Sequence, residues 1–302
     1  MQRRALLQFG GAISVSASAL LAGCGGGSDS HTAIRIRGEQ RLLHYDTQGN
    51  TLEWSDQDNW VRFYDASDKL KWSFNGVGSR VGPLNSPSGV MVLGERIYIS
   101  DFANSRIIVL DRNGNFLFDF GESGDDKNDL FFVHEPVLGP DGLIYFCDAL
   151  HHRVQVYDAN GQWKKSIGQF GTDANGLNYP ESLAFDADGQ MHVVDSGNGR
   201  VMVFDASGAV VRHYGALGDK PGQMLNPEGI AIDTEGNVYV SDKTQCVLHI
   251  YDRQGRFKER VPVFLSNGDY GVPGEMRWRP DGALHVTASR DGSQGLIPRQ
   301  YL

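Results

Sequence analysis

Apolar and polar residues alternate along most of the chain in short runs, and each run is followed by a turn sequence. Residues 180–215 give the clearest case, where "PESLAFD", "QMHVVD", "RVMVFD" and "AVVRHYG" are separated by "ADG", "SGNG" and "ASG". A period of two is typical of half-buried β-strands, and the glycines supply the positive φ that hairpin turns require. No segment keeps a helical period. The pattern therefore predicts four consecutive antiparallel strands in this stretch.

Two aspartates of this unit recur along the chain at an almost constant interval. The aspartate that closes the third strand of each unit is found at Asp65, Asp111, Asp158, Asp205 and Asp252. The aspartate that closes the second strand is found at Asp56, Asp101, Asp148, Asp195 and Asp242. The intervals are 46 or 47 residues in the first series and 45 or 47 in the second. Two markers that share one period indicate a repeat architecture.

A four-stranded unit of this length cannot bury both of its faces alone, whereas radial stacking of copies buries them. We therefore predict an all-β fold, a six-bladed β-propeller of four-stranded antiparallel blades. The expected blades lie near 39–80, 81–127, 128–174, 175–221, 222–268 and 269–302. The last unit holds three strands, and we expect residues 31–38 to add its outer strand and close the ring. An open solenoid is the alternative.

Three units carry an arginine at a fixed distance after the second-strand aspartate. The pairs are Asp101 with Arg106, Asp148 with Arg153, and Asp195 with Arg200. We predict that each forms an ion pair that fixes the corner between two strands of its blade, with the two-pronged contact typical of arginine. A catalytic role is the alternative, although active sites are not normally repeated in every blade.

The sequence of the repeat resembles that of a known family. "PSGVMVLGERIYISDFANSRIIVLD" and "PESLAFDADGQMHVVDSGNGRVMVFD" are similar to the NHL repeat, and "DGLIYFCDALHHRVQVYD" and "PEGIAIDTEGNVYVSD" follow it as well. The similarity fades in the first and sixth units. The resemblance implies a six-bladed propeller of the NHL type. It implies no particular function, because propellers host many.

The first thirty residues differ from the repeats. Arg3 and Arg4 precede an apolar stretch rich in Ala and Ser that ends in "LAGC" and is followed by "GGGSDS". This stretch resembles a bacterial lipoprotein signal, which implies cleavage before Cys24 and lipidation of its thiol. "QRRALLQ" also resembles a twin-arginine export signal. A plain secretory signal or a core helix is the alternative.

These resemblances imply an exported protein that is lipid-anchored at the cell envelope, facing the periplasm or the cell surface. The expected organisation is a signal peptide at 1–23, a Gly/Ser linker with lipidated Cys24 at 24–30, and the propeller at 31–302. Removal of Arg3 and Arg4 from the 28 Lys and Arg leaves 26 against 37 Asp and Glu, a formal charge of −11. Because nucleic-acid binding needs clustered basic residues, we expect no nucleic-acid partner, and membrane contact only through the lipid on Cys24.

The first strand of each unit is expected to begin on the face onto which the central channel of the propeller opens. The residue after the repeated proline then lies at the channel mouth, at Ser88, His134, Glu181, Glu228 and Gly274. His134, Glu181 and Glu228 are ligand types suited to one divalent cation, Zn²⁺, Mn²⁺ or Ca²⁺. Alternatively, Pro-Glu-Gly is part of the ordinary repeat sequence, and His134 is a hydrogen-bonded histidine at the rim.

The peptidyl-amidating lyases and the streptogramin lyases are similar propellers that place functional histidines after the same proline. This resemblance implies a role for His134, but the chain has glutamate at two of those positions and Phe102 where the lyases have a corner tyrosine. His151 and His152, in the corner of the third unit, are further catalytic candidates. Alternatively, His151 occupies the place of the asparagine in the Asn-x-Arg corner.

Motifs for a nucleophile elbow, a zincin helix, a CxxC pair and a phosphate-binding glycine loop are missing from the sequence. Two hypotheses follow. The first is a monomeric, exported, lipid-anchored propeller that binds a protein, peptide or glycan partner through its loop face. The second is a metal-dependent lyase or hydrolase with its site at the channel mouth, similar to the two lyase families.

Overall fold

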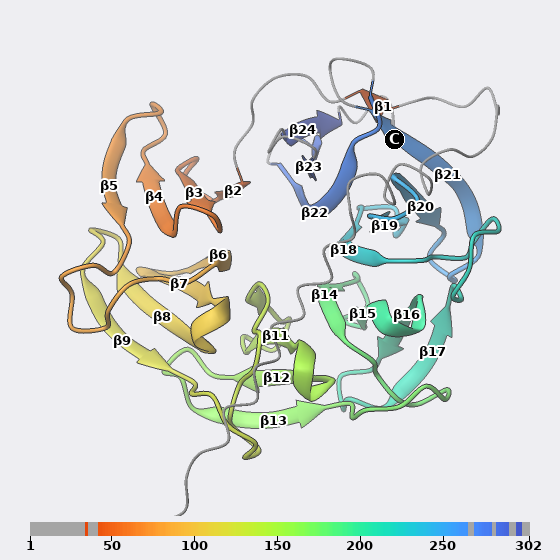
Figure 1. Cartoon of the computed structure of the whole chain (residues 1–302), viewed down its shortest axis with the longest axis horizontal. Helices are drawn as coiled ribbons and strands as arrows, with labels where there is room; N and C mark the ends of the chain where they lie inside the picture. The colour runs from red at the N-terminus through yellow and green to blue at the C-terminus, as the bar shows by residue number, and fades with distance from the viewer. Residues whose placement is uncertain (1–33, 36–41, 265–268, 280–281, 290–293, 298–302) are drawn as a thin grey trace, which may run out of the picture.

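The computed structural model describes residues 34–35, 42–264, 269–279, 282–289 and 294–297. Its sheets stand radially around a central axis, as the blades of a propeller do (Figure 1). The predicted signal peptide, the linker and the lipidated Cys24 lie outside the described residues. Within the described ranges, no helix is long and apolar enough to cross a membrane.

Five sheets contain four consecutive antiparallel strands, because each of these strands pairs with the next one along the chain. The first holds β2 (Leu42–Tyr45), β3 (Thr51–Ser55), β4 (Trp60–Tyr64) and β5 (Leu70–Phe74), and the second holds β6 (Pro87–Leu93), β7 (Arg96–Asp101), β8 (Arg106–Asp111) and β9 (Phe116–Phe120). The third holds β10 (Val137–Leu138), β11 (Ile144–Asp148), β12 (Arg153–Tyr157) and β13 (Trp163–Ile167), and the fourth holds β14 (Pro180–Phe185), β15 (Met191–Asp195), β16 (Arg200–Phe204) and β17 (Val210–Tyr214). The fifth holds β18 (Pro227–Ile232), β19 (Val238–Asp242), β20 (Val247–Tyr251) and β21 (Phe257–Phe264). The predicted all-β propeller of four-stranded antiparallel blades is thus confirmed for these sheets.

The sixth sheet departs from the prediction. It has three strands, β22 (Val272–Trp278), β23 (Leu284–Ser289) and β24 (Gln294–Ile297). The prediction of six four-stranded blades is therefore wrong in its count, because five sheets are complete blades. The predicted closing strand is wrong as well, since β1 (Ile34–Arg35) pairs in parallel with the outer edge of β21. At eight residues β21 is the longest outer strand, and its unpaired edge offers backbone groups that β1 satisfies.

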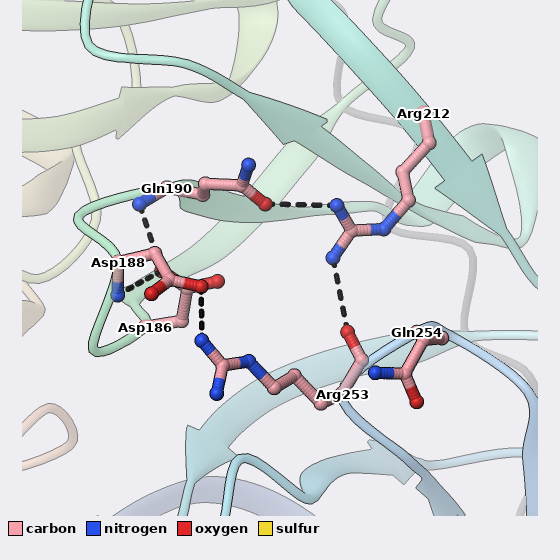
Figure 2. Close-up of a pocket in the computed structure, with 6 residues that line it drawn as sticks. All are labelled: Asp186, Asp188, Gln190, Arg212, Arg253 and Gln254. Carbon is pink, nitrogen blue, oxygen red and sulfur yellow. Dashed lines mark hydrogen bonds and ion pairs between the residues drawn. The ribbon is translucent and has the colours of Figure 1, made fainter.

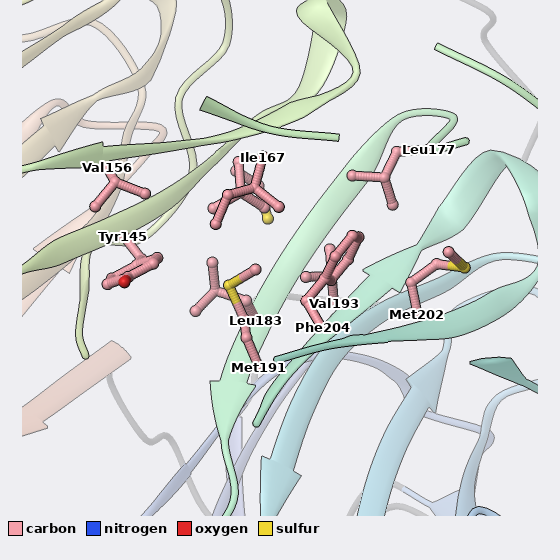
Figure 3. Close-up of a cluster of buried hydrophobic side chains, with 11 residues drawn as sticks. Tyr145, Val156, Ile167, Leu177, Leu183, Met191, Val193, Met202 and Phe204 are labelled. Atoms are coloured by element: carbon pink, nitrogen blue, oxygen red, sulfur yellow. The ribbon is translucent and has the colours of Figure 1, made fainter. Parts of the chain in front are cut away.

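The contacts between neighbouring sheets are of two kinds. Apolar clusters fill each space from the first sheet to the sixth, and Figure 3 shows the cluster between the third and fourth sheets. Between the sixth sheet and the first, Arg277 lies 5.2 Å from the ring centroid of Trp54, and Arg279 lies 5.2 Å from that of Tyr45. These cation–π contacts join the end of the propeller to its beginning.

Buried ion pairs lie at three blade corners, where the short turns η1 (Phe102–Asn104), η2 (Ala149–His151) and η3 (Ser196–Asn198) follow the second strand. The Nε–Oδ2 distances are 2.8 Å for Arg106–Asp101, 2.9 Å for Arg153–Asp148 and 2.7 Å for Arg200–Asp195. The contact is made through Nε alone and is not two-pronged. The remaining guanidinium nitrogens donate to backbone carbonyls, as Arg200 does to Gly176.

The corner aspartates also hold the backbone at the start of their own blades. They accept a hydrogen bond from the amide of Asn85 (2.7 Å, Asp101), Phe131 (2.8 Å, Asp148), Asn178 (2.6 Å, Asp195) and Leu225 (2.7 Å, Asp242). Each of these amides precedes an inner strand, so a buried carboxylate holds the segment that leads into that strand. In the first sheet Ser55 occupies the corner position opposite Trp60, and Asp56, the marker expected from the sequence, lies one residue later.

We expect Arg200→Leu to lower the free energy of unfolding by about 3–5 kcal/mol, because it leaves the buried Asp195 carboxylate without its cation. The Arg200 side chain is 9% exposed and that of Asp195 is fully buried. Urea unfolding followed by circular dichroism measures the change. Arg256→Leu is the matched control, because Arg256 pairs with Asp252 but is 77% exposed. Equal effects of the two substitutions would contradict a structural role for the corner pair.

Candidate functional site

The inner strands begin on the face of the propeller that carries the turns η1–η3. Pro180 of β14 lies opposite Asp195, and Pro227 of β18 lies opposite Asp242, next to the corners. The residues after these positions therefore surround one mouth of the central channel. Two pairs of the residues expected there are close together, because His134 lies 3.2 Å from Glu181 and a Cβ atom on Gly274 would lie 3.6 Å from Oε1 of Glu228.

His134 is fixed by contacts from two sheets. Its amide donates to the carbonyl of Cys147 at 3.0 Å, and its own carbonyl accepts the hydroxyl hydrogen bond of Ser100 at 2.7 Å. The imidazole lies edge-on to Phe102, with the ring centroids 5.2 Å apart. Its Nε2 atom is 3.2 Å from Oε2 of Glu181. The mouth thus brings together an imidazole and a carboxylate from neighbouring blades.

Burial lowers the pKa of His134, and the negative charge of Glu181 opposes this shift without overcoming it. The imidazole is therefore neutral at pH 7, with a side chain that is 13% exposed. A neutral imidazole beside a carboxylate can accept a proton, because the carboxylate stabilises the imidazolium that forms. This pair has the properties of a general base.

Two further charged residues lie at the mouth, and the sequence analysis missed both. Lys243, which directly follows the corner Asp242, forms an ion pair with Glu228. Burial lowers the pKa of Lys243, whereas Glu181, Glu275 and Asp56 act in the opposite direction. Burial, then the charge of Glu181, raises the pKa of Glu275 to about 7. A carboxyl group and an amine with shifted pKa values, both close enough to feel the charge of Glu181, are typical of functional sites.

The missed residues had weak signals in the sequence. Alignment on the repeated proline selects Gly274 in the sixth unit, and Glu275 is the next residue. Lys243 is the residue after the corner aspartate, where the other units have Phe102, Ala149 and Ser196. A search of all charged residues within one position of a corner or an inner-strand start finds both.

The predicted three-ligand metal site is not assembled. His134 and Glu181 are in contact, but Glu228 is paired with the ammonium group of Lys243. Within the part of the chain that the structure describes, no three His, Cys, Asp or Glu side chains are gathered as a metal ion requires. The donor set therefore does not fit a divalent cation in this arrangement, because the positive charge of Lys243 competes for the same carboxylate.

His151 and His152, the other catalytic candidates, form hydrogen-bonding contacts at or next to the blade corners. Nδ1 of His151 lies 2.8 Å from Oδ2 of Asp148, the contact that Asn198 makes with Asp195 in the next blade, also at 2.8 Å. Nδ1 of His152 accepts the backbone amide of Tyr179 at 2.9 Å. The imidazole of His151 is thus bound to the corner carboxylate and that of His152 to a backbone amide, so among the three candidate histidines the geometry favours His134 for chemistry.

Aromatic side chains cover one side of the mouth. Phe102 stacks on Phe132 with the ring centroids 4.6 Å apart, and Phe131 lies edge-on to Phe132 at 5.1 Å. All three rings are half-buried. Phe102, at the position where the lyases have a tyrosine, packs on His134 and has no hydroxyl to offer. The mouth therefore combines an apolar wall with a group of charged residues.

A separate polar pocket of about 280 Å³ lies between the hairpin turns of the fourth and fifth blades (Figure 2). Arg253 contacts Asp188, whereas Arg212 donates to Gln190 at 2.8 Å and, within the described residues, has a buried Nε atom without a hydrogen-bond partner. No expected site residue lines it. This pocket is therefore a weaker candidate than the channel mouth.

Comparisons with known proteins show the fold. No protein-family model and no curated protein matches the sequence. Among solved structures, virginiamycin B lyase from Staphylococcus aureus is 12% identical, with a TM-score of 0.64 over 87% of this chain and 85% of that one. A gluconolactonase from Xanthomonas campestris is 16% identical, with a TM-score of 0.62 over 89% and 87%. A calcium-binding regucalcin from Agrobacterium tumefaciens is 16% identical, with a TM-score of 0.61 over 88% and 95%.

These similarities confirm a propeller, and at such low identity they show no more than that. Membership of the NHL-repeat family stays a prediction, because it rests on the sequence motif of the repeat alone.

We expect Glu275→Gln to change the pH dependence of stability. The folded pKa of about 7 lies above the ordinary value of 4.5, so the folded state holds a proton that the unfolded state loses between those values. The proton on Glu275 therefore adds to the free energy of unfolding at low pH, and this contribution is lost as the pH rises from 4.5 to about 7. The stability of Glu275→Gln relative to the natural chain should then increase between pH 4.5 and 7.

Urea unfolding at a series of pH values measures this difference. Glu259→Gln is the matched control, because Glu259 is exposed on β21. A difference between Glu275→Gln and the natural chain that does not change with pH would show that Glu275 titrates as an ordinary carboxyl group.

Proposed function

We propose that this protein is an enzyme, a lyase or hydrolase, that carries out general acid–base chemistry at the loop-face mouth of its central channel. The contact between His134 Nε2 and Glu181 Oε2, at 3.2 Å, carries the proposal. It joins a neutral imidazole, whose side chain is 13% exposed, to a carboxylate of the neighbouring blade. Lys243 and Glu275, both with displaced pKa values, lie in the same group.

Each residue has a distinct role in the proposed chemistry. His134 accepts a proton from the substrate or from water, and Glu181 stabilises the resulting imidazolium. The ammonium of Lys243 stabilises the negative charge that develops on a substrate carbonyl or enolate. Glu275, with a pKa near 7, donates a proton to the leaving group. The aromatic wall of Phe102 and Phe132 contacts the apolar part of the substrate.

Metal participation is not part of this proposal, since Lys243 pairs with the carboxylate of Glu228 that a cation would require. The regucalcin with a similar fold is a calcium-binding protein, so the assay below includes cations as a variable.

We also propose a binding function, because exposed apolar side chains repeat on the loop face. Val77, Phe170 and Leu217 are 70%, 63% and 60% exposed and stand at equivalent positions of three blades. Exposed apolar side chains that repeat around a rim favour contact with a protein or peptide partner. Export and a lipid anchor on Cys24 would place this face at the cell envelope.

Two substrates test the enzymatic proposal, quinupristin and a gluconolactone, which represent the activities of the similar structures. We expect turnover of at least one of them, with a loss of about 10²–10⁴-fold in His134→Ala and in Glu181→Gln. His213→Ala is the matched control, because His213 is exposed on β17. Each rate is measured in EDTA and with added Ca²⁺, Mn²⁺ or Zn²⁺.

Turnover that persists in EDTA and disappears in His134→Ala supports side-chain chemistry. Turnover that requires an added cation supports the metal-dependent form of the hypothesis. Turnover that His134→Ala leaves unchanged, or none with either substrate, contradicts the proposed site.

A further inference from the structure

A second cavity lies at the opposite end of the channel from the mouth. It has a volume of about 370 Å³, and the inner strands of five sheets line it at the ends that lead into the hairpin turns. We call it the lower cup. Its apolar wall includes Val137, Leu183, Phe185, Ile230, Ile232 and Met276. A pocket of this size and character is suited to a small molecule with an apolar body.

An ion pair across the axis closes the inner end of the lower cup. Arg277 of the sixth sheet pairs with Glu135, which directly follows His134 in the third sheet, on the opposite side of the ring (Figure 1). Space at this level is tight, because a Cβ atom on Gly89 would lie 2.8 Å from the side chain of Glu135. The lining of the lower cup includes none of the charged residues of the mouth, so we treat the two as separate sites.

The guanidinium of Arg277 is only partly satisfied. One nitrogen contacts Glu135, and within the described residues its buried Nη2 atom has no hydrogen-bond partner. Burial of an arginine with an unused donor costs free energy unless an acceptor is supplied. An anionic ligand in the lower cup can supply that acceptor.

His44 also lines the lower cup, and it adds to the same preference. Burial, then the charge of Arg277, lowers the pKa of His44 to about 3. The imidazole is therefore neutral and offers one N–H donor beside the guanidinium. Glu135 also lines the lower cup and balances the charge of Arg277, so the preference for an anion rests on the unused Nη2 donor.

We propose that the lower cup binds a small monocarboxylate with an aliphatic body, and that it is a binding site distinct from the catalytic mouth. The carboxylate contacts Arg277 and His44, and the aliphatic chain packs against β14 and β18. Arginine prefers carboxylate because its planar nitrogens match the two oxygens. This inference does not depend on the proposed enzymatic function.

Isothermal titration of the full-length protein with octanoate tests the proposal, with octan-1-ol and acetate as comparison ligands. Octanoate is expected to bind with a dissociation constant below about 1 mM. Octan-1-ol keeps the chain and lacks the charge, so it should bind at least about tenfold more weakly. Acetate keeps the charge and lacks the chain, so it should not bind measurably.

Ala184→Leu narrows the lower cup and should weaken octanoate binding at least about tenfold, since Ala184 lines it. Ala206→Leu is the matched control, because Ala206 is exposed on a hairpin turn. Arg277→Lys keeps the positive charge and loses the planar fork, so it should reduce the preference for octanoate over octan-1-ol. This variant carries the test if Ala184→Leu does not fold, which thermal unfolding shows.

Three results would overturn the proposal. The first is no saturable octanoate binding. The second is equal binding of octanoate and octan-1-ol. The third is octanoate binding that neither Ala184→Leu nor Arg277→Lys changes.

Discussion

The buried corner aspartate is the constraint on which the arrangement of the channel depends. In the third and fourth blades, Asp148 and Asp195 each bind an arginine through one oxygen and the backbone amide that precedes the inner strand through the other. The carboxylate thus connects the outer part of the blade to the first residues of the strand that lines the axis. An unpaired carboxylate at this depth would be costly, so the arginine and the amide are both required.

The candidate site is a consequence of this constraint. The amides of Phe131 and Asn178, which these carboxylates bind, lie three residues before His134 and Glu181. Because adjacent blades are held in the same way, the two side chains meet at the mouth although they are 47 residues apart in the sequence. Burial then decides the protonation states, since the pKa of His134 is lowered and that of Glu275 is raised to about 7. A base that is unprotonated and an acid that is half protonated at neutral pH follow from position alone.

The repeat made much of the fold predictable. Period-two alternation and the regularly spaced aspartates locate five four-stranded blades, because strand pairing within a blade is local in sequence. Blade closure was not predictable in the same way. Whether residues 34–35 pair with β24 or with β21 depends on which distant edge is exposed, and the alternation pattern contains no such information.

The same limit applies to the site. Ser88, His134 and Glu181 were found by counting from a repeated proline, but Glu275 and Lys243 were missed, because each lies one residue from an aligned position. The Glu135–Arg277 pair crosses the axis between opposite blades, and neither residue stands out in the repeat.

The central claim is that His134 and Glu181 act as one electrostatic unit at the channel mouth. Nuclear magnetic resonance titration of the His134 side chain tests it most directly, in the natural chain and in Glu181→Gln. The account predicts a His134 pKa below the ordinary value of 6.5 that falls further in Glu181→Gln, because the charge that raises it has been removed. A pKa at the ordinary value that Glu181→Gln leaves unchanged would contradict the account.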